Sequence, residues 1–94
     1  MLLDHFEQYI EDVRGIKEKT MKKYIGAIYA INDLLQSYSF PIQNLFNVKN
    51  STEIEKVRIF LKENDEFLEK DLRGHRMYSV AFKHYARFVQ WYFD

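Results

Sequence analysis

The segment HRMYSVAFKHYARFVQWYF, residues 75–93, carries the clearest structural pattern in this chain of 94 residues. Its apolar side chains recur at spacings of four, three, four and three, which places them on one face of an α-helix. These residues are Tyr78, Phe82, Tyr85, Val89 and Tyr92. Because neither Gly nor Pro interrupts the segment, it predicts one long helix from about His75 to Phe93.

A short helix is predicted directly upstream of this segment. Asn64 and Asp65 interrupt the apolar pattern and can cap a helix start, and Gly74 ends the helix before the long one begins. The residues expected to face inward are Phe67, Leu68 and Leu72.

Another helix is predicted before it, starting in a run of capping residues. Asn50 with Glu53, or Thr52 with Glu55, would form a capping box at its first turn. The residues expected to face inward are Ile54, Val57, Phe60 and Leu61.

The first half of the chain predicts two further helices. Gly15 ends the first of them as its C′ residue, and Thr20 is the candidate N-cap of the second. The first apolar stripe consists of Leu3, Phe6, Ile10 and Val13, and the second of Tyr24, Ile28, Ile31 and Leu35. Pro41 prevents the second helix from continuing, so residues 39–50 form a connector. The buried anchors expected in this connector are Leu45 and Phe46.

Together these patterns predict an all-α fold, a compact bundle of four to five helices in a single domain spanning residues 1–94. The 94 residues are too few for two self-sufficient cores. A hydrophobic content of 47% argues against disorder, and no apolar run approaches the roughly 18–20 residues of a transmembrane helix. The early acid Asp4 argues against a signal peptide, and the absence of Cys favours a cytoplasmic protein. We therefore expect no membrane partner.

The sequence lacks the motifs of the common catalytic centres. The three His residues lie apart, none is followed by a second ligand at the i+3 or i+4 spacing of a helical metal site, no HExxH is present, and no Cys is available as a metal ligand or nucleophile. Phosphate-binding loops and nucleophile elbows are also absent from the sequence. No Glu or Gln is followed two residues later by Lys, the spacing expected in a nuclease centre. We therefore expect a protein that is not an enzyme and that needs neither metal nor cofactor.

Basic residues are concentrated in two segments, although the chain as a whole is neutral, with 14 Lys and Arg against 14 Asp and Glu. Residues 14–23 hold five bases and one acid, and residues 73–93 hold four bases and no acid. Between them, residues 50–71 hold seven acids and four bases. Within the long helix, Arg76, Lys83 and Arg87 fall within about 40° of one another.

Two basic segments at helix starts favour contact with a phosphate backbone, because free amides at a helix start also attract anions. The candidate nucleic-acid-binding residues are Lys19, Lys22, Lys23, Arg73, His75, Arg76, Lys83 and Arg87. The alternative is ordinary solvated surface, in which Arg76 pairs with Asp71 or Glu69 and the lysines extend into water.

Aromatic residues crowd the C-terminal end, where they make up seven of the last 17 residues. One helix face cannot bury all of them, so Phe88, Trp91 and Phe93 are predicted to lie off the stripe and to form a partner interface. The alternative is that these three side chains close the core against the first helix.

Two segments resemble known DNA-binding modules. Residues 5–24, HFEQYIEDVRGIKEKTMKKY, resemble the opening of the SAM-like core-binding domain of tyrosine recombinases and phage integrases, with Gly15, Thr20 and Tyr24 at the characteristic positions. Residues 72–88, LRGHRMYSVAFKHYARF, are similar to the end of a related module that precedes nuclease domains in some restriction-type and HNH endonucleases. The resemblance implies a helical module that clamps double-stranded DNA beside a separate catalytic domain.

The sequence departs from these families in two respects. It lacks the Arg, His and Tyr set of a recombinase catalytic domain, and it is not net basic. We therefore expect either the N-terminal domain of a larger protein or a stand-alone relative from a phage or mobile element.

Two functions are compatible with these sequence features. The charge segregation and the resemblance favour a DNA-binding module that contacts phosphates weakly and without sequence preference. Neutrality and small size favour an interaction module, which would bind a protein partner, an adjacent catalytic domain or a second copy through its aromatic C-terminal surface.

Overall fold

The computed structural model describes residues 2–94 and confirms the all-α prediction for them. Five α-helices and one short 3₁₀ helix follow one another, and the described residues contain no strand. The elements are α1 (Leu3–Asp12), α2 (Glu18–Ser37), η1 (Leu45–Asn47), α3 (Ser51–Lys62), α4 (Asp65–Arg73) and α5 (Met77–Phe93). None of these helices is long and apolar enough to cross a membrane.

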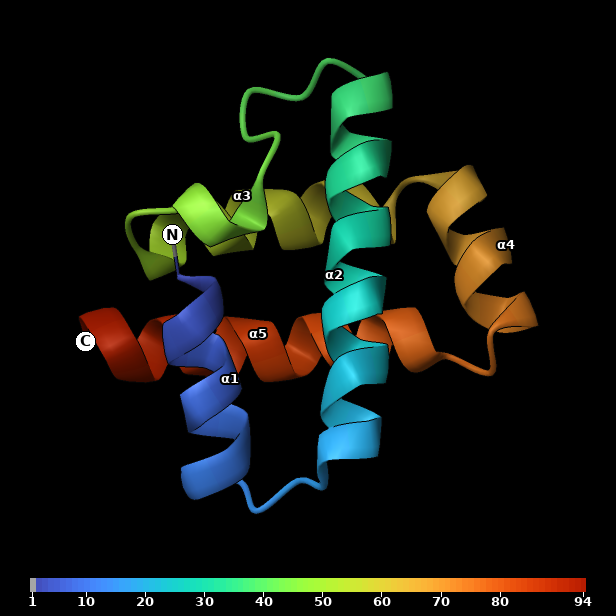
Figure 1. Cartoon of the computed structure of the whole chain (residues 1–94). Coiled ribbons are helices and arrows are strands. Elements are labelled where there is room, and N and C mark those ends of the chain that lie inside the picture. Colours follow the sequence, from blue (N-terminus) through green and yellow to red (C-terminus); the bar gives the residue numbers. More distant parts are fainter. Residues whose placement is uncertain (1) are drawn as a thin grey trace.

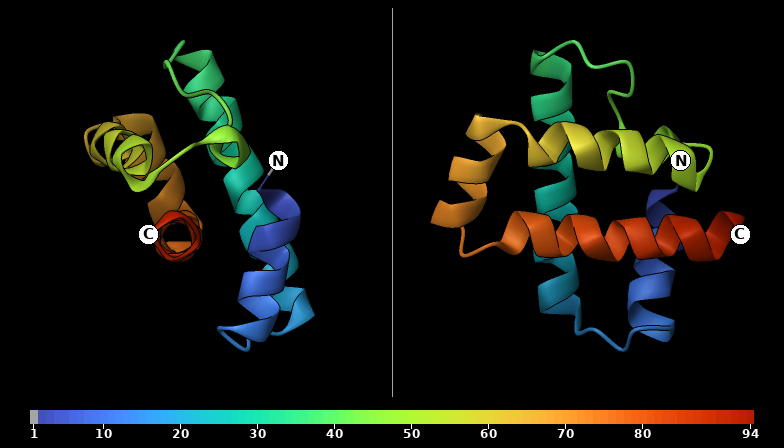
Figure 2. Two further views of the ribbon diagram at one scale, coloured as in Figure 1. Left: turned by 90° about the vertical axis from the view of Figure 1, so that its left-hand side faces the viewer. Right: turned by 180° about the vertical axis from the view of Figure 1, so that it is seen from behind.

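The helices form two crossed layers (Figures 1 and 2). α1 and α2 run antiparallel in the front layer of Figure 1, and α3 and α5 run antiparallel behind them. α4 closes one side and joins α3 to α5. The resulting body measures 34 × 28 × 16 Å, so it is a slab with two broad faces.

The core lies where the two layers cross, and its centre is aromatic. The ring of Tyr85 on α5 lies 4.9 Å from that of Phe6 on α1 and 5.6 Å from that of Phe46 in η1. The ring of Phe88 lies 5.5 Å from that of Phe6, and all four residues are buried. α2 adds Ile28, Ile31 and Leu35 of the predicted stripe to this cluster, together with Ala27 and Leu34, whereas Tyr24 of the stripe is only partly buried.

A buried polar residue, Asn32, holds the connector between α2 and α3 against the core. Its Oδ1 accepts a 2.8 Å hydrogen bond from the backbone N–H of Leu45, and its Nδ2 donates to Oδ1 of Asn44 at 3.2 Å. The hydroxyl of Tyr85 donates to the backbone carbonyl of Leu45 at 2.7 Å, and burial raises the pKa of this phenol. The bond from Asn32 provides an acceptor for the buried N–H of Leu45, and the bond from Tyr85 adds to the one that the Leu45 carbonyl accepts from the N–H of Val48.

The predicted caps of α3 and α4 are confirmed. The side chain of Asn50 accepts a 2.9 Å bond from the N–H of Glu53, and that of Asn64 accepts a 2.8 Å bond from the N–H of Phe67. Gly15 has a φ of 63°, as expected of a residue that turns the chain after α1.

The starts of α2 and α5 differ from the prediction. α2 begins at Glu18 with Lys17 as its N-cap, so Thr20 lies within the first turn and is not the cap. α5 begins at Met77, because His75 and Arg76 adopt left-handed φ values of 55° and 64°.

Gly74, predicted to end α4, does so with a φ of −90°, which any residue type can adopt. A Cβ atom there would lie 2.8 Å from the ring of Tyr78. A side chain at this position would therefore force the ring of Tyr78 to move, whereas the backbone conformation itself does not favour Gly.

Two apolar predictions for α4 are wrong. Leu72 is 65% exposed and Leu68 is also exposed, while Asp71 between them is buried. α4 closes one side of the slab and packs with a single strip of its surface, so Phe67 and Asp71 occupy its inward face. Periodicity alone could not identify this face, because the carboxylate of Asp71 has a partner only in the tertiary structure.

Candidate functional site

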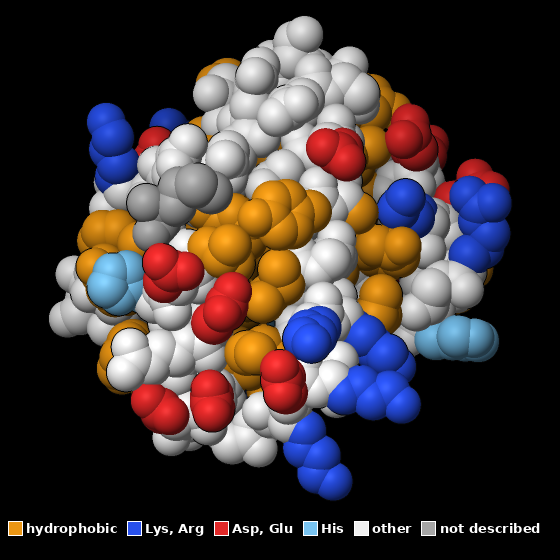
Figure 3. All heavy atoms as spheres, in the orientation of Figure 1, with side chains coloured by type: hydrophobic (Ala, Val, Ile, Leu, Met, Phe, Trp, Pro, Cys, Tyr) orange, Lys and Arg blue, Asp and Glu red, His pale blue; other side chains and the backbone are white. Residues whose placement is uncertain are grey.

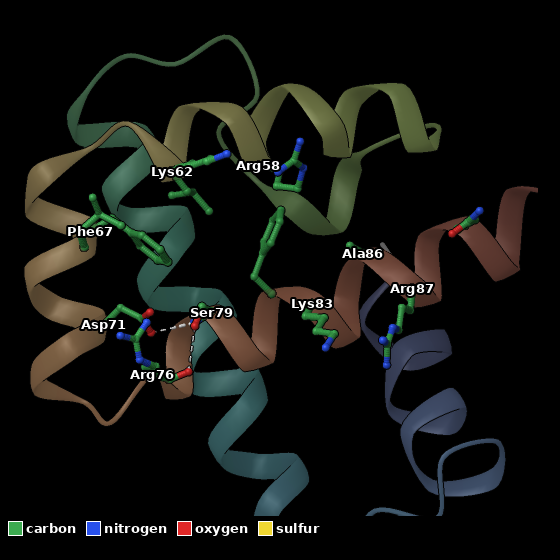
Figure 4. A pocket seen from close by; sticks show the side chains of 13 residues that line it. Arg58, Lys62, Phe67, Asp71, Arg76, Ser79, Lys83, Ala86 and Arg87 are labelled. Atoms are coloured by element: carbon green, nitrogen blue, oxygen red, sulfur yellow. Dashed lines mark hydrogen bonds between the residues drawn. The ribbon is translucent and has the colours of Figure 1, made fainter.

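A groove of about 440 Å³ with an apolar floor lies between α3, α4 and α5 (Figure 4). The floor consists of Leu61, Phe67, Phe82 and Ala86. We call it the α3–α5 groove. It lies on the broad face opposite the α1–α2 layer, the face turned to the viewer in the right-hand view of Figure 2.

Five basic side chains surround this groove, and all five residues are exposed. Arg58 and Lys62 come from α3, and Arg76, Lys83 and Arg87 come from α5 and its N-cap. Arg58 is paired with Glu55, one turn earlier on α3, and this interaction lowers the pKa of Glu55. The other four form no ion pair within the described part of the chain. The rim of the α3–α5 groove therefore presents four basic side chains that form no ion pair with the described residues, and a fifth, Arg58, whose charge is offset by Glu55.

The acid in this groove, Asp71, is committed to a structural role. It is 5% exposed, and its Oδ1 accepts a 2.8 Å hydrogen bond from the backbone N–H of Ser79 in the first turn of α5. A carboxylate at a helix N-terminus is stabilised by the helix dipole. Figure 4 shows this carboxylate at the start of α5, at the same end of the groove as Arg76.

The alternative pairing of Arg76 is not observed. The ion pair formed on α4 joins Arg73 to Glu69 at 3.6 Å, and Arg76 contacts Asp71 through a 2.7 Å backbone hydrogen bond instead. The left-handed φ of Arg76 turns the chain here between α4 and α5. Its guanidinium group is therefore available at the groove (Figure 4).

The structure brings together only part of the predicted set of eight. Arg76, Lys83 and Arg87 line the α3–α5 groove, whereas Arg73 and His75 lie at the α4–α5 corner. The remaining three are Lys19, Lys22 and Lys23.

The three lysines lie on the first two turns of α2, in the other layer, and Lys22 pairs there with Glu18 at 3.5 Å. Figure 3 shows Lys and Arg side chains gathered around the lower part of this layer, separated from the acids over α1. Lys22 and Lys23 are in the second turn of α2, not the first, because the helix starts three residues earlier than predicted, with Lys17 and not Thr20 as its N-cap. Of the three lysines, only Lys19 therefore lies in the first turn of α2, where the helix-start amides are.

Two residues of the groove, Arg58 and Lys62, were not among the candidates that the sequence patterns indicated. They lie one turn apart on α3, within a segment whose net charge is negative, so an average over the segment hides them. Their i, i+4 spacing shows that they share one helix face. Only the packing of α3 beside α5 shows that this face borders the basic stripe of α5.

His84 lies on α5 between two residues of this basic stripe. Its ring stacks on that of Tyr24 at 5.0 Å, and its Nδ1 is buried without a hydrogen-bond partner. Burial lowers the pKa of His84, and the positive charges of Arg14, Arg87 and Lys83 lower it further. Lys83 and Arg87 of α5 and Arg14 of the α1–α2 connector therefore all place positive charge near His84.

We expect the stability of the protein to fall slightly between pH 7 and pH 5. The pKa of His84 is lower in the folded state than its ordinary value of 6.5, so the folded state binds a proton less readily than the unfolded state. The free energy of unfolding is therefore unaffected above pH 6.5 and decreases as the pH falls from 6.5 toward the native pKa. Because the ring is only partly buried, the loss stays under about 1 kcal/mol. Urea denaturation at both pH values measures it. In a His84→Gln variant the decrease should be smaller, and an unchanged decrease would contradict this assignment.

The aromatic prediction is partly wrong. Phe88 is fully buried, because α1 packs against that side of α5 and its ring contacts Phe6 and Tyr9. Trp91 and Phe93 are exposed as predicted. Tyr92, predicted to be in the core, is 41% exposed, since α5 extends past the crossing of the layers at its C-terminal end.

Among residues 2–94, no group of three or more His, Cys, Asp or Glu side chains is placed to hold a metal ion. Comparisons of the chain with protein-family models, curated proteins and solved structures gave no match.

Proposed function

We propose that this protein binds double-stranded DNA through the phosphate backbone, using the broad face that carries the α3–α5 groove. The observation that supports this most directly is the convergence of Lys62, Arg76, Lys83 and Arg87 on one face, from two separate helices. Phosphate contacts from Lys and Arg supply most of the affinity of non-specific DNA binding. The resemblance of residues 5–24 and 72–88 to DNA-binding modules is consistent with this proposal.

The dimensions of this face suit a duplex. From Arg76 to Arg87, α5 spans about 16 Å, which corresponds to about five base-pair steps along the axis of a B-form duplex. The face as a whole measures 34 × 28 Å, close to the length of about one turn of a B-form duplex. The basic side chains around the α3–α5 groove can contact the DNA backbone without any protein segment entering a DNA groove, which agrees with binding that is independent of sequence.

We expect weak, salt-dependent binding to any duplex. With about four phosphate contacts, the logarithm of the association constant should fall with the logarithm of the salt concentration with a slope of about −3 to −4. At low salt the dissociation constant should be in the micromolar range, as is usual for non-specific contacts. Fluorescence anisotropy of two labelled duplexes of unrelated sequence, titrated at several NaCl concentrations, measures both quantities. If no salt-sensitive binding appears at low ionic strength, the proposal is wrong.

A further inference from the structure

A second cavity, of about 260 Å³, lies between α1 and the C-terminal end of α5. The α1 residues that line it include His5, Tyr9 and Asp12, and Trp91 and Tyr92 line it from α5. We call it the aromatic pocket. Pockets for drug-sized ligands occupy about 300–1,000 Å³, so this one suits a single side chain or a small head group.

The rings of the aromatic pocket are arranged in two tilted pairs. Trp91 and Tyr9 lie 5.2 Å apart at 48°, and Tyr92 and His5 lie 5.0 Å apart at 45°. Phe88 supports both pairs from the core, with its ring 5.5 Å from that of Tyr9 and 5.6 Å from that of Tyr92. Rings tilted in this way do not cover each other's faces, and Trp91 is 57% exposed. Electron-rich ring surface is therefore available to a ligand.

The charge around the aromatic pocket is negative. Asp12 is the charged carboxylate that lines it, and no Lys or Arg does so. Three more acids of α1 lie outside the lining of the pocket, and Figure 3 shows acidic side chains gathered over this helix. These acids are Asp4, Glu7 and Glu11. The pocket thus offers π faces and a carboxylate to a cation, and it opposes an anion.

We infer that the aromatic pocket binds a quaternary ammonium group. A trimethylammonium head group is weakly hydrated and apolar on its surface, so it can lie against aromatic faces while its charge interacts with the rings and with Asp12. The pocket lies at the edge of the slab, on residues that do not line the α3–α5 groove. This inference is therefore independent of DNA binding.

Trp91 provides a direct readout, because it is the single Trp of the chain. We expect tetramethylammonium chloride, exchanged for NaCl at constant ionic strength, to change the Trp91 emission saturably, with a dissociation constant in the millimolar range. Choline and a trimethyllysine peptide are titrated in the same way. The ligand with the lower dissociation constant identifies whether the quaternary ammonium group belongs to a small molecule or to a protein. The neutral isostere 3,3-dimethyl-1-butanol should cause no saturable change. Equal binding of this alcohol, or a linear response to all compounds, would overturn the inference.

Matched variants separate charge from general structural effects. Asp12→Asn should weaken tetramethylammonium binding by about threefold to tenfold, whereas Glu11→Gln, the same change of charge on the neighbouring residue outside the aromatic pocket, should leave it within about twofold. Tyr92→Leu should also weaken binding while keeping Trp91 as the probe. Circular dichroism and thermal melting establish that each variant is folded. If Asp12→Asn and Glu11→Gln behave alike, Asp12 has no part in the site and the inference fails.

Discussion

Replacing Lys83 and Arg87 together by Glu is expected to lower the affinity for duplex DNA by about a hundredfold. Each substitution removes one phosphate contact and introduces a repelling charge, and a loss of about 1.4 kcal/mol per contact corresponds to tenfold in affinity. The salt dependence should decrease as well, by about one unit of slope for each contact removed. Both side chains are exposed, so the fold should be retained. Anisotropy titrations at about 0.1 M salt measure the affinity, and circular dichroism verifies the fold.

The matched control is Lys19→Glu with Lys23→Glu, which makes the same change in net charge. These two residues are exposed on the first two turns of α2, in the other layer of the slab. At about 0.1 M salt the screening length is about 10 Å, shorter than the 16 Å thickness of the body. The control should therefore lose less than about threefold. An equal loss in the two variants would show that net charge alone governs binding, and a larger loss in the control would assign the DNA contact to α2.

Replacing Asn32 by Leu is expected to destabilise the fold by about 2–4 kcal/mol. The backbone N–H of Leu45, a fully buried residue, would lose its acceptor, and an unsatisfied buried donor costs about 1–3 kcal/mol. The hydrogen bond to Asn44, which itself caps η1 by accepting from the N–H of Phe46, would be lost in addition. The connector would then hold Leu45 and Phe46 less firmly in the aromatic core. Urea denaturation followed by circular dichroism measures the change.

Gln36→Leu is the chemical control for this variant. Gln36 lies one turn further along α2 and is exposed, so exchanging its amide side chain for the same isobutyl group should change stability by no more than about 0.5 kcal/mol. If Asn32→Leu were as harmless as Gln36→Leu, the buried amide would have no structural role. If both variants lost stability equally, the loss would reflect added surface hydrophobicity.

The helices of this protein were predictable from local sequence, and their boundaries were less so. The apolar stripes of α2 and α5, and the caps of Asn50 and Asn64, depend on residues within one to three turns, which a sequence displays directly. The start of α5 was misplaced because His75 and Arg76 adopt left-handed backbone conformations, which are uncommon for residues other than Gly. The tertiary contacts of α4 and α5 hold that turn in place, for instance through the bond from Ser79 to the carboxylate of Asp71.

Part of the candidate site was also predictable from the sequence. The common direction of Arg76, Lys83 and Arg87 follows from helical geometry alone, so the basic stripe of α5 was visible in the sequence. Its continuation onto α3 through Arg58 and Lys62 was not, and neither was its separation from the lysines of α2. Which charges share a surface depends on how whole helices pack, and the net charge of a segment carries no information about that.

The sequence by itself therefore determined that this chain is helical, which side of α2 and most of α5 is buried, and where basic residues are abundant. The tertiary structure alone decided that Phe88 is covered by α1 while Trp91 is exposed, and that the polar residues Asp71 and Asn32 can be buried. The physical reason is the distance along the sequence over which each interaction acts. Helix propensity, capping and periodicity act between residues a few positions apart, whereas burial and the satisfaction of a buried polar group depend on partners that only the packed layers bring within hydrogen-bond or van der Waals distance.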